Sequence, residues 1–155
     1  MNTSSMANLL AEQRFFAGIP DRFVATISEL ASERRADIDE LLWRQGQRAD
    51  RFYLVKTGRI AIEQYAPGRD PIVVDQASEG DVVGWSWLVA PYRWTFDARA
   101  VEPSSLIDID AAALRDRFGV DPILGYEVMQ RFFPVMGRRL SSALERLVEC
   151  ITEQS

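Results

Sequence analysis

Residues 80–100 read GDVVGWSWLVAPYRWTFDARA and hold three of the four tryptophans in the chain. Gly80 and Gly84 flank a short apolar segment, and glycine tolerates both positive φ and the close approach of other groups to its backbone. The tryptophans that follow supply large apolar side chains beside that backbone. The segment therefore predicts a ligand pocket, or the remnant of one, between two β-rich halves of a small sensing domain.

Composition narrows the function classes. The 155 residues are 47% apolar, which suits one domain (residues 1–155) with its own core. The net charge of −5 argues against a nucleic-acid surface, because phosphate binding depends on clustered Lys and Arg. The absence of histidine excludes His-based catalysis and His metal ligands, and Cys150 alone cannot form an internal disulfide. We expect no catalytic residue, no metal and no cofactor.

The chain carries no pattern that predicts export or membrane insertion. Residues 1–11 lack a basic segment followed by a long apolar core, so no signal peptide is expected. The longest apolar run, near residues 82–92, is too short to span a bilayer. The sequence predicts a cytoplasmic protein with no membrane partner.

The middle of the chain has the pattern of an antiparallel β-structure. Between residues 34 and 109, short runs of alternating apolar and polar residues are separated by Gly, Pro and Asp turns. About eight such runs predict a jelly roll, or double-stranded β-helix, over residues 34–109. The fold class is therefore mainly β with flanking helices.

Helices are expected before this roll, over residues 8–33, with residues 1–7 outside regular structure. A short helix should carry Leu9 to Phe16 and end at the Gly-Ile-Pro run that follows. Proline suits the first turn of a helix, so a second helix should run from Pro20 to about Ser32.

Helices are also expected after the roll, over residues 110–153. Asp110 is a suitable N-cap for the first of them. The next should begin at Pro122 and bend or break at Pro134 and Gly137 before a last helix. In the helix that begins at Pro122, one face should carry Leu124, Val128 and Phe132.

Four segments of the chain, taken in order, match a known family. Glycines occupy the turns at Gly46, Gly58, Gly80 and Gly84. The pattern resembles the cyclic nucleotide-binding domain of the catabolite-activator (CRP/FNR) superfamily. The resemblance covers about residues 16–147 and implies a jelly roll with a regulatory, non-enzymatic role. The matching segments are Phe16-Ala-Gly-Ile-Pro20, Arg44-Gln-Gly-Gln-Arg-Ala-Asp50, Phe52-Tyr-Leu-Val-Lys-Thr-Gly-Arg-Ile60 and Gly80-Asp-Val-Val-Gly84.

The resemblance also identifies two replaced residues. In family members that bind cyclic nucleotide, the residue after the fourth glycine is usually a Glu that holds the ribose hydroxyl; here it is Trp85. The Arg that pairs with the cyclic phosphate falls on Trp94. Arg93 lies one place earlier, where strand alternation turns it to the opposite face unless a bulge intervenes. Loss of both charged contacts predicts weak cyclic nucleotide binding.

Two interpretations of the aromatic segment remain open. The indoles either contact an apolar or aromatic small molecule in a sensor, or fill a former pocket in a ligand-free interaction module of the same fold. A cavity of a few hundred Å³ favours the sensor, and a filled interior favours the module. The candidate ligand-binding residues are Val83, Gly84, Trp85, Ser86, Trp87, Leu88, Arg93, Trp94 and Thr95.

The C-terminal segment carries apolar residues spaced four, three and four apart, as in a heptad seam. This seam packs on its own roll or pairs with the same helix of a second chain. The resemblance favours a homodimer, because homodimers of that family use this helix. The candidate dimer residues are Phe133, Leu140, Leu144, Leu147 and Ile151.

The resemblance also predicts how the protein passes on a signal. The sequence ends where the DNA-binding helix-turn-helix domain of such regulators would begin. We therefore expect no direct DNA binding, and a signal that passes through the dimer helix or a separate partner. An enzyme with a related roll, such as a cupin, is disfavoured because cupins ligate metal through histidines.

Overall fold

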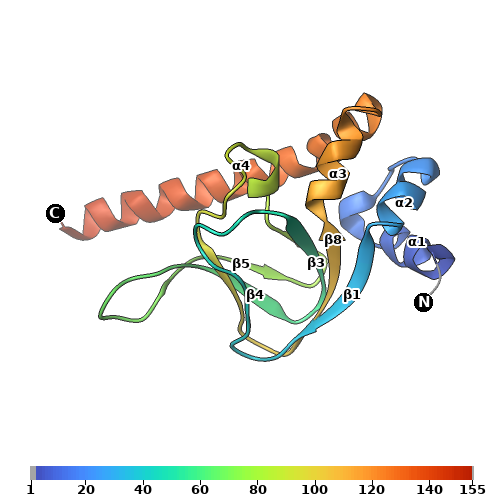
Figure 1. Ribbon diagram of the computed structural model, residues 1–155. Helices are drawn as coiled ribbons and strands as arrows, with labels where there is room; N and C mark the ends of the chain where they lie inside the picture. The colour runs from blue at the N-terminus through green and yellow to red at the C-terminus, as the bar shows by residue number, and fades with distance from the viewer. Residues whose placement is uncertain (1–2, 155) are drawn as a thin grey trace.

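The computed structural model describes residues 3–154, which form two four-stranded antiparallel sheets flanked by helices (Figure 1). The strand orders are β1-β8-β3-β6 and β2-β7-β4-β5. This arrangement confirms the predicted jelly roll. The strands are β1 Ala31–Ala36, β2 Leu41–Trp43, β3 Arg51–Thr57, β4 Arg59–Gln64, β5 Ile72–Ser78, β6 Val82–Val83, β7 Asp97–Ala100 and β8 Ser104–Asp110.

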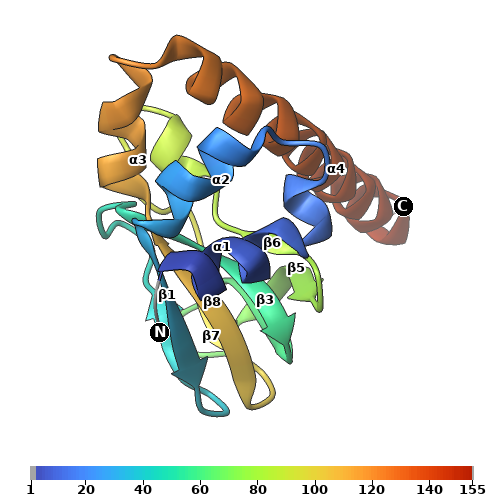
Figure 2. The same cartoon turned by 90° about the vertical axis from the view of Figure 1, so that its right-hand side faces the viewer.

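Helices cover one side of the roll. Figure 2 shows α1, α2, α3 and α4 gathered on the same side of the strands. The C-terminal part of α4 extends beyond the roll (Figure 1). The helices are α1 Thr3–Ala11, η1 Arg14–Phe16, α2 Asp21–Ser28, η2 Ser86–Leu88, α3 Ala111–Phe118 and α4 Pro122–Gln154.

An aromatic cluster joins the first sheet to the helices. Phe52 of β3 stacks on Trp87 of η2, with ring centroids 5.0 Å apart, and meets Phe132 of α4 edge to face at 5.2 Å. Leu124, Val128 and Phe132 are fully buried, which confirms that they share one face of α4. Burial of these large apolar side chains stabilises the helix against the roll.

The predicted cap at the end of the roll is also confirmed. Asp110 closes β8, and its Oδ1 accepts a hydrogen bond of 3.0 Å from the backbone N–H of Ala113. This bond satisfies an amide of the first turn of α3 that has no partner within the helix.

The N-terminal prediction was wrong in two respects. Helix α1 includes residues 3–7, which were expected outside regular structure, while residues 1–2 lie outside the described part of the chain. Met6 and Leu10 are four positions apart and both buried, so they share the face that holds α1 on the core. The helix expected from Leu9 to Phe16 divides into α1 and η1.

The second helix was predicted too long. Helix α2 ends at Ser28 rather than near Ser32, and β1 begins at Ala31 rather than at Arg34. Ala31 pairs with Ile109, and the carbonyl of Leu30 accepts from the N–H of Asp110 at 2.9 Å. Pairing with β8 therefore overrides the helical spacing of Leu30 and Ala31.

A break in the C-terminal helix was also predicted wrongly. Helix α4 is continuous over 33 residues with Pro134 inside it. Proline removes one N–H donor from such a helix. Phe132 anchors α4 before this point and Arg139 anchors it after, because Arg139 bonds to β5 and to the carbonyl of Val82.

One ion pair lies inside the second sheet. Glu63 of β4 is 3% exposed, and Arg99 of β7 donates to both of its carboxylate oxygens, at 3.0 and 2.7 Å. A third bond of 2.6 Å joins Arg99 to Asp39. The hydrogen bonds to Glu63 raise the pKa of Arg99. Arg99 therefore neutralises a buried carboxylate.

We predict that Arg99→Met lowers the free energy of unfolding by about 3 kcal/mol, because it leaves Glu63 buried without its cation. The expected loss of unfolding free energy is at the low end of the range for buried ion pairs, because the Arg99 side chain is 28% exposed. Urea denaturation measures the change. Arg59→Met is the matched control and should cost less than about 1 kcal/mol, because Arg59 and Glu102 are half exposed and 3.8 Å apart. Equal losses in the two variants would refute the prediction.

Candidate functional site

A cavity of about 460 Å³ lies between the second sheet, the loop that follows β6, and helix α4. Its volume is within the range of small-molecule sites. In Figure 1, α4 passes over the side of the roll that holds β4 and β5. The lining residues are Trp43, Ile62, Val74, Asp75, Gly84, Trp85, Ser86, Trp94, Thr95, Phe96, Met136, Arg139, Leu140, Ala143 and Arg146.

Two stacked indoles form one wall of this cavity. The rings of Trp43 and Trp94 are 3.7 Å apart between centroids and 9° from parallel. Both residues are buried, and the Nε1–H of Trp43 donates to the carbonyl of Phe96 at 2.8 Å. Tyr53 extends the stack on Trp43, at 6.1 Å. The stack is a rigid, apolar, planar surface.

The backbone at Gly84 lies against the edges of the same indoles. Its φ is +99°, and a Cβ atom there would lie 2.6 Å from Cη2 of Trp94 and 3.1 Å from Cη2 of Trp43. Glycine is thus required both by the backbone conformation and by the space. The other family turn glycines, Gly46, Gly58 and Gly80, also have positive φ, as their turns predict.

Five of the nine candidate ligand-binding residues line the cavity. They are Gly84, Trp85, Ser86, Trp94 and Thr95.

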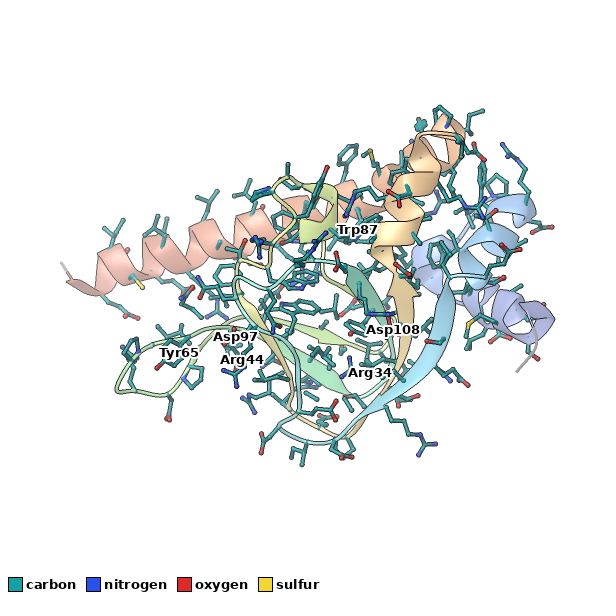
Figure 3. All side chains as sticks on the ribbon, viewed as in Figure 1. Arg34, Arg44, Tyr65, Trp87, Asp97 and Asp108 are labelled. Carbon is teal, nitrogen blue, oxygen red and sulfur yellow. The ribbon has the colours of Figure 1, made fainter. Side chains whose placement is uncertain are left out.

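The other four candidate residues lie elsewhere. Val83 is buried in β6, where it pairs with Tyr53. Trp87 is fully buried in the aromatic cluster on the helical side of the roll, as Figure 3 shows, and Leu88 packs beside the core. Arg93 is exposed and donates to the carbonyl of Gly46 at 2.9 Å.

The structure shows where the two tryptophans lie that replace the charged residues of the family pattern. Trp85 is half-buried and Trp94 is buried, and both line the cavity. Arg93 is not among the lining residues, and its guanidinium bonds to a carbonyl instead. The segment to which the family resemblance assigns the ribose and phosphate contacts thus presents indoles to this cavity.

The sequence interpretation missed Trp43, which lies in a different segment from the other cavity tryptophans. It reaches Trp94 because β2 pairs with β7, with Trp43 opposite Ala98. The available signal was that Trp43 is the one tryptophan outside residues 80–100.

Arg139 was also missed. Its side chain is 10% exposed and lies in the cavity wall, where Nη1 bonds to Oδ2 of Asp75 at 2.5 Å and Nη2 to the carbonyl of Val82 at 3.2 Å. Burial lowers the pKa of Arg139, and the Asp75 carboxylate opposes that shift. Arg146, about two helical turns further along α4, lines the cavity and donates to the carbonyl of Val73 at 2.6 Å.

The candidate dimer residues project from α4 into solvent. Phe133, Leu140, Leu144, Leu147 and Ile151 are between 53% and 62% exposed, so the roll of the same chain does not cover them. Leu140 additionally lines the cavity.

Other site classes were searched across the described part of the chain. Among residues 3–154, no group of three or more His, Cys, Asp or Glu side chains is arranged to hold a metal ion. None of the helices within that range has both the length and the apolar content that crossing a membrane requires.

Two of the solved structures that share this fold are bacterial proteins. A protein of Geobacter metallireducens that is assigned as a cyclic nucleotide-binding protein is 26% identical, with a TM-score of 0.78 over 86% of this chain and 97% of that chain. A cyclic nucleotide-binding domain of Methylobacillus flagellatus has a TM-score of 0.74 at 16% identity, over 95% of this chain and 83% of that chain. The second likeness shows the fold alone.

Sequence comparisons identify a curated relative and a family model that match this chain. An uncharacterized protein of Mycobacterium tuberculosis is 35% identical over 75 residues, which are 48% of this chain but only 14% of that relative's length. The model of the cyclic nucleotide-binding domain matches residues 33–119, more than half of the chain. The chain therefore belongs to the cyclic nucleotide-binding domain family.

Proposed function

We propose that this protein is a regulatory sensor whose cavity binds an apolar or aromatic small molecule rather than a cyclic nucleotide, and that it is not an enzyme. The family consists of regulatory binding domains, which supports a binding role. The observation that carries the proposal is the cavity of about 460 Å³ that remains beside the stacked Trp43 and Trp94. A ligand-free module with indoles filling its interior is less consistent with that volume.

The composition of the cavity argues against a cyclic nucleotide. The sugar and phosphate of such a ligand need charged partners, and Trp85 and Trp94 stand at the positions that supply them in the family. Hydrogen bonds to charged groups contribute about 1.5–3 kcal/mol each, so losing two weakens binding on the order of a hundred- to ten-thousand-fold.

We predict that calorimetric titration with cAMP and with cGMP gives no saturable binding at micromolar nucleotide. The reason is the loss of both charged anchors. Near-ultraviolet circular dichroism of the same sample serves as the control that the aromatic core is folded. Stoichiometric binding of either nucleotide at micromolar concentration would contradict the proposal.

A neutral aromatic probe tests the cavity directly. We predict that 4-phenylbutyramide changes the tryptophan fluorescence in a saturable manner, because three tryptophans line the cavity. Val74→Phe should weaken this binding about tenfold or more by occupying the space. The matched control is Ile72→Phe, on the same strand at an exposed position outside the lining, and it should bind as the parent does. Equal effects of the two variants would favour the ligand-free module.

The sensor is proposed to act as a homodimer joined through α4. Its apolar seam follows a heptad spacing, and an apolar stripe left in water favours association. The support is the exposure of Leu144, Leu147 and Ile151 on a helix that extends beyond the roll (Figure 1). The output is expected to pass through this helix or a separate partner in the cytoplasm.

We predict that the parent protein sediments as a dimer and that Leu144→Asp sediments as a monomer, because the substitution places a charge in the apolar seam. Analytical ultracentrifugation measures both. Glu145→Lys changes the charge beside the seam on the same helical turn and should leave the dimer intact. A monomeric parent protein would disprove the dimer.

A further inference from the structure

The cavity has an excess of positive charge on its α4 side. Arg139 and Arg146 both line it, whereas Asp75 is the one carboxylate among its lining residues. Two guanidinium groups thus face one carboxylate, which leaves one positive charge. A ligand with a single negative charge restores the balance.

Arg139 also retains an unused donor. Its two terminal nitrogens bond to Asp75 and to the carbonyl of Val82, but within the described part of the chain its buried Nε has no hydrogen-bond acceptor. This Nε is covered by protein atoms, so a ligand in the cavity reaches Arg139 through its terminal nitrogens, each of which carries two N–H groups.

The rest of the cavity is apolar and defines the body of the ligand. Stacked indoles form one wall, so a flat ring or an alkyl chain fits there better than a sugar. The apolar lining residues are Trp43, Ile62, Val74, Trp85, Trp94, Phe96, Met136, Leu140 and Ala143.

We infer that the cavity takes an apolar or aromatic carboxylic acid, whose carboxylate binds at Arg139 and Arg146 while its body lies against Trp43 and Trp94. The inference rests on the proposed function, in which this cavity binds a small molecule. The planar guanidinium matches a carboxylate with two parallel hydrogen bonds.

Asp75 does not prevent this arrangement. Nη1 of Arg138 lies 3.9 Å from Oδ1 of Asp75, on the other carboxylate oxygen from the one that Arg139 holds. Asp75 therefore keeps a cation close by when Arg139 shares its charge with a ligand. Among the described residues, Arg146 donates to a backbone carbonyl of β5 and no carboxylate forms an ion pair with it.

The test compares two probes that differ in charge and little else. 4-Phenylbutyrate and 4-phenylbutyramide have the same body, and the phenyl ring does not interfere with indole fluorescence. At neutral pH and low salt, the carboxylate should bind the full chain at least about tenfold more tightly than the amide, and added salt should reduce that ratio. Fluorescence titration gives both affinities.

Three substitutions locate the effect. Arg146→Gln should reduce the ratio of carboxylate to amide affinity severalfold, and Arg139→Gln should do the same if the variant remains folded. Arg35→Gln is the matched control: it removes the same charge, but Arg35 is an exposed residue of β1 and is not a lining residue, so the ratio should stay at the parent value. Equal reductions by Arg35→Gln and Arg146→Gln would overturn the assignment of the carboxylate site.

The outcomes separate this inference from the proposed function. If both probes bind with equal affinity, the carboxylate site is overturned while the sensor cavity stands. If neither probe binds, both the carboxylate site and the sensor cavity fail.

Discussion

The stack of Trp43 on Trp94 is the contact around which the cavity is built. It joins β2 to the segment that precedes β7, and it lies directly on the backbone of Gly84. The rings are held from outside by Tyr53 and by the bond from Trp43 to Phe96. Because both indoles are fixed by the fold itself, the aromatic wall exists before any ligand arrives, and such preorganisation favours binding.

Local signals in the sequence were sufficient for much of the fold. The positive φ of the turn glycines and the Asp110 cap are signalled by the local sequence, and the structure agrees with both. The end of α2 was missed because Leu30 and Ala31 fit a helical period, whereas their backbone groups pair with β8. The continuity of α4 depends on anchors on both sides of Pro134 that no local rule detects.

The candidate site was only partly predictable, because contacts between distant segments bring some of its residues together. Gly84, Trp85 and Trp94 lie in one segment, and the family pattern identified their positions. Trp43 reaches the cavity because β2 pairs with β7. Arg139 reaches it because α4 packs on the roll, whereas the sequence pattern of α4 indicated only an apolar seam. Trp87 lies in the same aromatic segment as Trp85 and Trp94. Its side chain packs away from the cavity, because η2 turns it toward Phe52 and Phe132.

Leu140 belongs to two surfaces at once, since it lines the cavity and stands in the exposed seam of α4. Under the proposed function, a ligand in the cavity and a second copy of α4 both contact this side chain. Thermodynamic linkage then makes their effects reciprocal: a ligand that alters self-association has an affinity that varies with protein concentration. The consequence to expect from this one shared leucine is that titrations at dilute and at concentrated protein disagree.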